Sequence, residues 1–294
     1  MASPASSSSS GTAVDPGTDA LTVRFWGVRG SIAASGEAFR DFGGHTPCVE
    51  VRCGSRLFVV DAGTGISALG VELGTGAPPE IDVVLSHLHL DHVGGLPFFK
   101  PALMGDRLVR IHCGNLRGET AAEALDRLFA PPLFPISLSQ LPGQVEHVGF
   151  KAGEDLTFAD GYVASTIPLN HPGGATGYRF GHRGRAMCYI SDIEHQEPWP
   201  PPDLAEFVRN ADLVIFDGMF SETEYLRCQG WGHSTWQKGV ALCEAAGVSQ
   251  LAVYHLHPQH TDEYLRDQER QLKAAMPGAF LARQGAVLAY PPTS

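Results

Sequence analysis

Apolar runs that alternate with polar residues, or that are continuous and β-branched, predict most of the strands in this chain. Clusters of Gly, Pro and polar residues separate successive runs, as is typical of the turns between strands. The predicted strands occupy residues 21–26, 48–53, 56–61, 82–86, 108–113, 145–149, 162–168, 176–181, 186–191, 212–217 and 250–255.

Apolar residues at helical spacing predict helices between and after these strands. The predicted helices occupy residues 65–73, 94–103, 118–129, 234–247 and 261–276. Ser234 is the expected N-cap of the fourth helix and Gly247 its end, while Thr261 or Asp262 caps the fifth. Many strands precede the first long helix, so we expect sheets packed on each other with helices outside.

The N-terminal residues 1–20 lack any such pattern. They are rich in Ser, Ala, Gly and Pro, which cannot bury enough surface to offset the cost of ordering. We therefore expect a disordered tail over 1–20 and a single domain over 21–294. The tail has neither the basic nor the apolar region of a secretory signal, and no apolar run approaches a membrane span. A cytoplasmic location without membrane contact is expected.

Composition narrows the partners that this chain is expected to have. Hydrophobic residues make up 43% of the sequence, which is typical of a globular protein. The 21 Lys and Arg residues against 32 Asp and Glu give a net charge of −11, without any basic block. This balance disfavours a large nucleic acid as partner. The six cysteines contain no C-x-x-C pair and are expected to be reduced thiols.

The segment "VVLSHLHLDHVGG" carries the clearest candidate chemistry. It places His87, His89, Asp91 and His92 directly after an apolar strand. Alternate side chains at a strand end face the same way, so His87 and His89 can face one point while the next turn brings Asp91 and His92 to a neighbouring one. Imidazole and carboxylate are ligands for Zn²⁺, Fe or Mn²⁺. A surface loop that is merely rich in histidine is the weaker alternative.

The H-x-H-x-D-H spacing after a buried strand resembles the signature of the metallo-β-lactamase superfamily. The resemblance implies an α+β fold, a four-layer αββα sandwich with metals at one edge and further ligands at later strand ends. His171, Asp192 and His255 follow extended runs in the order that the superfamily requires. Two divalent transition-metal ions are implied, with Zn²⁺ as the first expectation and Mn²⁺ or Fe as alternatives.

The resemblance also implies how seven residues share two ions. One ion has three histidines, the other has two histidines and an aspartate, and one carboxylate bridges them: His87, His89 and His171; Asp91, His92 and His255; and Asp192. Asp217 is a rival for the bridging position and is otherwise expected to orient a histidine. Asp61 resembles an early strand-end aspartate that supports the site. His257 is a rival of His255.

Five further segments resemble the phosphodiesterase-like branch of this superfamily: "RFWGVRGS", "GGHTPCVEVR", "DAGTG", "PPLFPISL" and "GWGHST". That branch includes tRNA 3′-processing nucleases, phosphoribosyl cyclic phosphodiesterases and 3′,5′-cyclic-nucleotide phosphodiesterases. The nucleases need a basic arm, which is not found here, so a small phosphodiester is expected as substrate.

The implied activity is hydrolysis of 3′,5′-cyclic AMP or GMP to 5′-nucleotides by a metal-bridging hydroxide. The alternative is another small cyclic phosphate or an RNA 3′ end. A metal-binding sensor or a β-lactam or thioester hydrolase is the alternative of another class. A homodimer is left open.

His233 in "GHST" matches a histidine that acts near the leaving group in the nuclease relatives. It is expected to protonate the departing alkoxide, with a structural role before the helix as the alternative; Asp91 is counted with it as catalytic. Glu194 is the candidate support for His233. His45 stands where relatives tend to carry Asn and could contact substrate. Segment 114–150 is expected either to cover the substrate or to lie in the core.

Overall fold

The computed structural model describes residues 19–293. The tail predicted over 1–20 therefore lies outside the described residues, except for Asp19 and Ala20. Within 19–293, no helix combines the length and the apolar character needed to cross a bilayer.

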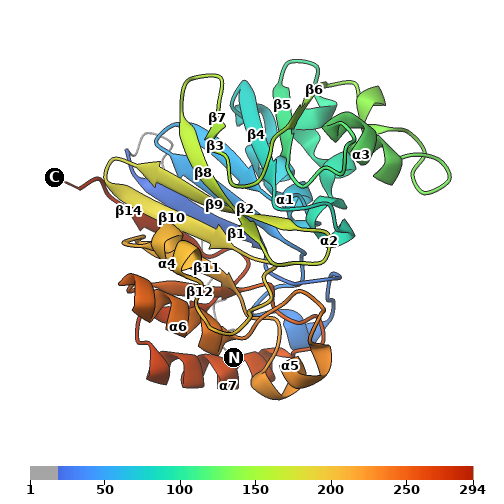
Figure 1. The fold of residues 1–294 in the computed structure, drawn as a ribbon. Helices are drawn as coiled ribbons and strands as arrows, with labels where there is room; N and C mark the ends of the chain where they lie inside the picture. The colour runs from blue at the N-terminus through green and yellow to red at the C-terminus, as the bar shows by residue number, and fades with distance from the viewer. Residues whose placement is uncertain (1–18, 294) are drawn as a thin grey trace, which may run out of the picture.

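The N-terminal half of the chain forms a seven-stranded sheet, which the last strand completes (Figure 1). Its first four strands in spatial order pair antiparallel, and β3 to β6 run parallel. In spatial order the strands are β14 (Val287–Tyr290), β1 (Leu21–Gly27), β2 (Cys48–Cys53), β3 (Arg56–Val60), β4 (Glu80–Leu85), β5 (Leu108–Cys113) and β6 (Gln144–Gly149).

The remaining strands form a second sheet of seven. Its parallel part joins β13 to β10, and its antiparallel part joins β10 to β7. In spatial order the strands are β13 (Ala279–Leu281), β12 (Leu251–Tyr254), β11 (Leu213–Asp217), β10 (Arg185–Ile190), β9 (Ala175–His182), β8 (Val163–Leu169) and β7 (Leu156–Thr157).

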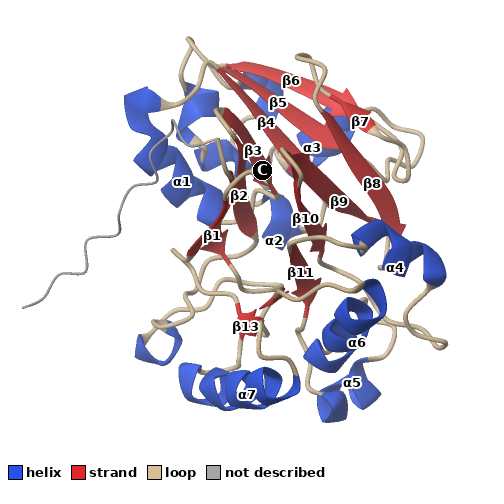
Figure 2. Cartoon of the chain, turned by 90° about the vertical axis from the view of Figure 1, so that its left-hand side faces the viewer, coloured by secondary structure: helices blue, strands red, loops and turns tan. Residues whose placement is uncertain are grey.

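Helices cover the outer faces of both sheets (Figure 2). The first sheet carries α1 and α3, which contact β1 and β6, and the second carries α4, α6 and α7. The helices are α1 (Gly65–Leu73), α2 (Leu90–Val93), α3 (Ala121–Leu128), α4 (Pro202–Val208), α5 (Glu222–Cys228), α6 (Trp236–Ala246) and α7 (Asp262–Ala275). The layers follow the order helix, sheet, sheet, helix, so the predicted αββα sandwich is confirmed.

Strand alternation builds two apolar clusters from the same strands. In β3, Phe58 faces the other sheet, and its ring centroid is 5.1 Å from that of Phe180. Val59, the next residue, belongs to the other cluster, with Leu69 of α1. Successive strand residues face opposite sides, so one strand contributes to both interfaces. The cluster that contains Phe58 and Phe180 lies between the sheets and draws residues from both. We therefore propose that 21–294 form a single domain.

The ends of the predicted strands lie within two residues of the observed ends, but the helix expected over 94–103 is wrong. Two short 3₁₀ turns, Leu96–Phe98 and Lys100–Leu103, replace it. Pro97 and Pro101 lack the backbone N–H groups that a continuous helix needs, which explains the break.

The N-cap predicted at Ser234 is also wrong by one residue. Thr235 occupies the cap of α6, because Ser234 is engaged elsewhere: its backbone N donates to Asp217 and its hydroxyl contacts His195 Nδ1 at 2.8 Å. Gly247 ends α6 in the left-handed conformation, with φ of 69°, as its sequence position predicted.

Candidate metal centre

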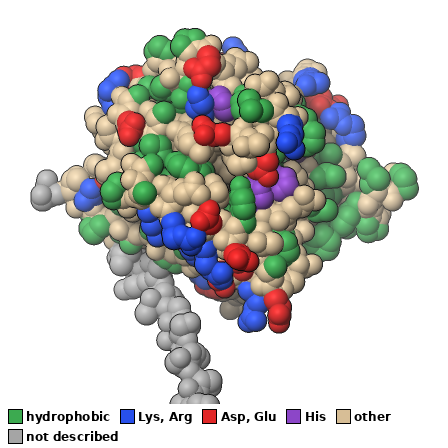
Figure 3. Space-filling view, turned by 90° about the horizontal axis from the view of Figure 1, so that it is seen from below, with side chains coloured by type: hydrophobic (Ala, Val, Ile, Leu, Met, Phe, Trp, Pro, Cys, Tyr) green, Lys and Arg blue, Asp and Glu red, His purple; other side chains and the backbone are tan. Residues whose placement is uncertain are grey.

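The carboxyl ends of five strands supply the site. Strands β3 and β4 are parallel neighbours in the first sheet, and β10, β11 and β12 are parallel neighbours in the second. Parallel strands end at one edge of a sheet, so polar residues that follow them gather there. The residues at or just after these strand ends are Asp61, His87, Asp192, Asp217 and His255. Seen from below, histidine side chains reach the surface beside acidic ones (Figure 3).

Three of these residues have a left-handed backbone that is unusual for a side chain other than glycine. Asp61, Asp192 and His255 have φ of 61°, 62° and 58°. This conformation costs roughly 1–2 kcal/mol per residue. It persists here where the chain leaves a strand and the side chain faces the opposite sheet, which is where strained residues of functional sites are expected.

The first group of ring nitrogens belongs to His87, His89 and His171. Their nitrogens lie within 4.8 Å of one another, and His89 Nδ1 is 3.1 Å from His171 Nε2. The Nε2 atom of His87 is buried without a hydrogen-bond partner. Burial lowers the pKa of all three rings, which keeps them in the neutral form that binds metals.

The second group consists of Asp91, His92 and His255. The two Nε2 atoms of the histidines are 3.2 Å apart, and Asp91 Oδ2 is 3.3 Å from His92 Nε2 and 3.2 Å from His255 Nε2. Burial alone would lower the pKa of both rings, but the surrounding carboxylates outweigh it. They raise the pKa of His92 well above its usual value and that of His255 to about 9. The carboxylates therefore favour positive charge at this point of the site, whether protons or a cation carry it.

The carboxylate of Asp192 lies between these two groups. Its Oδ1 is 3.9 Å from the Nε2 atoms of His87 and His171 and 3.4 Å from that of His255, and its Oδ2 is 3.3 Å from His92 Nε2. Burial would raise the pKa of Asp192, yet the histidines hold it well below its ordinary value, so the group is ionised. No other described carboxylate lies this close to nitrogens of both groups.

The spacing of these atoms fits a pair of divalent ions. Two nitrogens bound to one tetrahedral Zn²⁺ at about 2.0–2.1 Å lie roughly 3.3 Å apart, close to the 3.1 and 3.2 Å observed. The buried Nε2 of His87 has no hydrogen-bond partner among the described residues, so its lone pair can bind such an ion. The His and Asp donor set thus indicates a dinuclear divalent metal site, as predicted, without fixing the metal.

Outer residues hold the rings in place. Asp61 accepts hydrogen bonds from His92 Nδ1 at 2.8 Å, Ser86 N at 2.7 Å and the Tyr189 hydroxyl at 2.6 Å. These are the contacts of the supporting residue that the sequence predicted at Asp61. His171 Nδ1 donates to Gly232 O at 2.8 Å. Such outer contacts orient the ligand nitrogens and set the ring tautomers.

Asp217 contacts His233 rather than bridging the two groups. His233 Nδ1 donates to Asp217 Oδ2 at 2.8 Å, and the backbone N of Asp192 donates to the same oxygen at 3.1 Å. His233 and Asp217 also lie close enough to Asp192 and His255 to form a candidate metal group. However, His233 Nδ1 is already engaged, and no described residue hydrogen-bonds its Nε2.

Glu194, His45 and His257, whose roles the sequence left open, belong to neither of the two ligand groups. Glu194 does not contact His233; its carboxylate accepts from Gly230 N at 2.7 Å and Gly232 N at 2.8 Å, and so holds the loop before that histidine. His45 Nδ1 is 3.0 Å from Thr64 Oγ1. The half-buried His257 accepts from Gln259 N. The support expected from Glu194 comes from Asp217 instead, because the loop geometry directs Glu194 to backbone donors.

Sequence reasoning missed two backbone contributors. Ser31 N donates to Asp91 Oδ2 at 2.7 Å, and Ser31 itself has φ of 61°. The other is the Gly232 carbonyl described above. Backbone groups leave no side-chain signal, although both residues lie in the motifs "GVRGS" and "GWGHST".

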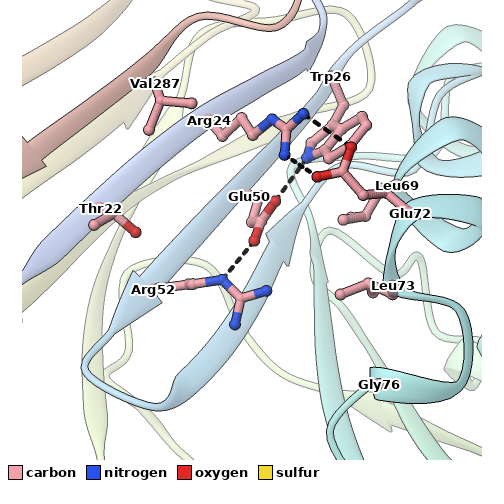
Figure 4. Close-up of a pocket in the computed structure, with 10 residues that line it drawn as sticks. All are labelled: Thr22, Arg24, Trp26, Glu50, Arg52, Leu69, Glu72, Leu73, Gly76 and Val287. Carbon is pink, nitrogen blue, oxygen red and sulfur yellow. Dashed lines mark hydrogen bonds and ion pairs between the residues drawn. The ribbon is translucent and has the colours of Figure 1, made fainter. Parts of the chain in front are cut away.

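A cavity on the outer face of the first sheet is separate from this centre (Figure 4). Arg24 is paired there with Glu72. Glu50 accepts from the Trp26 indole at 2.8 Å and from Arg52 Nε at 2.6 Å. Because these charges neutralise one another, the cavity offers no free cation to an anionic ligand.

Two packed sheets with helices outside, and a cluster of His and Asp at one edge, define a class of metal-dependent hydrolases. The chain belongs to the β-lactamase superfamily: the family model described as "Beta-lactamase superfamily domain" matches residues 56–256.

Known relatives agree with this assignment. Ribonuclease Z of Bradyrhizobium sp. (strain ORS 278) is 24% identical over 280 residues, covering 77% of this chain and 88% of the relative. The metallo-β-lactamase fold protein YhfI of Bacillus subtilis superimposes with a TM-score of 0.70 at 20% identity, covering 92% of this chain and 100% of YhfI. Human tRNase Z, short form, gives 0.65 at 18% identity, covering 92% and 99%. The predicted superfamily and a metal-dependent phosphodiester hydrolase are confirmed.

Proposed function

We propose that this protein is a two-metal phosphodiesterase that cleaves RNA near a 3′ end. The position of Asp192 carries the proposal, because its carboxylate lies 3.3–3.9 Å from ring nitrogens of both ligand groups. A shared carboxylate is what a pair of ions on one phosphodiester needs. RNA is favoured as the substrate because relatives are named Ribonuclease Z and tRNase Z. These names conflict with two expectations from the sequence, namely that the substrate is small and that a large nucleic acid is disfavoured as a partner.

The proposed ligand sets follow the two groups of nitrogens and oxygens. His87, His89 and His171 hold one ion, and Asp91, His92 and His255 hold the other, with Asp192 shared. When bound, the two ions activate water and neutralise the charge that develops on the phosphoryl oxygens. Asp91 acts as a ligand rather than a proton carrier, because His92 and His255 hold its pKa well below the ordinary value despite burial.

His233 is the proposed proton donor to the departing ribose oxygen. Asp217 accepts the hydrogen bond from Nδ1–H, so Nε2 remains to face the substrate. The ring is stacked on His255, with centroids 4.8 Å apart, which places it beside the ligand cluster. This role needs no basic arm and applies to any alkoxide leaving group.

Hydrolysis of 3′,5′-cyclic nucleotides is the second candidate. Two observations favour it: the resemblance of "FWGVRGS" and "DAGTG" to the cyclic-nucleotide group, and the net charge of −11 without a basic block. A negative chain repels long polyanions more than it repels a mononucleotide. The relatives that are named Ribonuclease Z give it no support.

A substrate panel tests the proposal on the purified, metal-loaded protein. The panel contains an RNA with a 3′ extension, cyclic AMP and GMP, and bis(p-nitrophenyl) phosphate. We expect cleavage of the RNA and of the phenyl ester, both abolished in Asp192→Ala and retained in the control Asp155→Ala, an exposed aspartate on a loop. Cleavage of cyclic nucleotides with intact RNA would select the second candidate. No cleavage of any phosphodiester would overturn both.

A further inference from the structure

A small cleft adjoins the ligand cluster on the side of α3. His87 and His89 form its inner end, and residues after β5 and β8 form the rest, enclosing about 190 Å³. The lining also includes Asn115, Arg117, Glu119, Arg127 and Gly173. The cleft is therefore continuous with the proposed metal centre but extends beyond it.

The charges in this cleft do not cancel. Arg127 is paired with Glu119 through both carboxylate oxygens, one of them 3.0 Å from Arg127 Nη2. Arg117 is exposed and forms no ion pair with any described residue. One positive charge is thus uncompensated beside the ligand cluster, in a chain whose net charge is −11. An unpaired cation at such a site is suited to an anionic part of the substrate.

Arg117 lies beside the loop that carries a predicted ligand. Gly173 lies two residues after His171 with φ of 89°, and a Cβ atom there would be 3.6 Å from Arg117 Nη2. Asn115 fixes the start of the segment: its amide donates to Ser86 O at 3.3 Å and to Thr176 Oγ1 at 2.9 Å. One guanidinium nitrogen of the exposed Arg117 therefore lies beside the loop that follows His171.

We infer that this cleft binds a second phosphate of the substrate, next to the one cleaved at the metals, with Arg117 as its cation. Pockets for whole small molecules start near 300 Å³, so about 190 Å³ accommodates a phosphate better than a nucleoside. The planar guanidinium can donate two parallel hydrogen bonds to phosphate oxygens. The inference rests on the proposed function and deepens it: a strand with several phosphates should be preferred to a cyclic mononucleotide, which has one.

The test compares substrates that differ by one phosphate. ApA, pApA and ApAp each contain a single internal phosphodiester, and the last two carry an additional terminal phosphate. In the native protein we expect one of these phosphates to raise kcat/KM roughly 10- to 100-fold, the range of a charge-assisted hydrogen bond. The measured quantity is the ratio of kcat/KM to that of ApA.

Three variants assign that ratio to the cleft. Arg117→Ala should bring it close to one, Arg117→Lys should retain part of it, and Glu119→Gln, which removes the competing negative charge, should increase it. Arg270→Ala, an exposed arginine of α7, should leave it unchanged. The gain should also shrink as salt is raised.

The outcomes separate the two proposals. If ApA is cleaved but neither phosphate increases kcat/KM, or if Arg117→Ala keeps the full gain, the cleft inference is wrong and the phosphodiesterase proposal stands. If none of the three substrates is cleaved by protein that contains its metals, the proposed function fails and the inference fails with it.

Discussion

Replacing His233 with alanine should slow cleavage of RNA while both metals stay bound. The His233 side chain is 10% exposed and its Nδ1 donates to Asp217 at 2.8 Å, so only Nε2 can contact the substrate. Asp217 keeps hydrogen bonds from the backbone N atoms of Asp192, Met219 and Ser234 when the ring is removed. The carboxylate is therefore not left unpaired, and we expect the fold to persist.

The size of the effect depends on the leaving group. A positioned proton donor contributes about 10²–10⁴-fold, or roughly 3–5 kcal/mol of the barrier. A ribose alkoxide needs that proton, so RNA should lose the full amount. p-Nitrophenolate departs without it, so bis(p-nitrophenyl) phosphate should lose less than about tenfold.

The assay measures kcat/KM for both substrates, metal content by elemental analysis and Tm for His233→Ala. The control is His182→Ala, a histidine at the far end of β9, which should change none of these. Equal losses on the two substrates would show that His233 binds or supports rather than donates a proton. Loss of a metal ion in the variant would make it a ligand.

The other predictions concern metal binding. Asp192→Ala should remove both ions, whereas Asp217→Ala should keep most of the metal; elemental analysis giving the reverse result would exchange their roles. Asp61→Asn should weaken metal affinity roughly 10- to 100-fold in a chelator competition, and an unchanged affinity would contradict its supporting role. Gly232→Ala would place a Cβ atom 2.3 Å from His171 Nδ1 at φ of 89°, so both Tm and metal affinity should fall. A variant with the Tm and metal content of the native protein would show that this loop can shift without cost.

Much of the metal centre could be predicted because its signal is local. Four of the seven proposed ligands lie in one six-residue stretch after an apolar strand, and His171, Asp192 and His255 each follow an extended run. Apolar residues at strand spacing lie close together in the chain, so the strands that precede the ligands can be recognised in the sequence. The resemblance to a known superfamily then gave the order of the ligands.

The support around His233 could not be predicted in the same way. Glu194 and Asp217 were both candidates to support this ring. Only the structure shows that the Glu194 carboxylate accepts hydrogen bonds from the backbone of Gly230 and Gly232 instead. The cleft of Arg117 likewise depends on the loop of Gly173, which lies beside the segment after β5 although it is over fifty residues later in the sequence. Such contacts depend on how separate loops pack.

By itself, the sequence determined the sandwich class, the positions of eleven of the fourteen described strands and the residue types that can hold metals. Periodicity and side-chain chemistry are properties of short segments, whereas β7, β13 and β14 are too short to show a period. Only the tertiary structure decided that Asp192 lies between the two groups while Asp217 faces His233. Parallel pairing places Ile190 level with Phe216, so Asp217 ends its strand and Asp192 lies one residue further along its own, where a left-handed turn redirects its side chain. That difference arises from the register between two strands and from the packing of two sheets, which bring together segments far apart in the sequence.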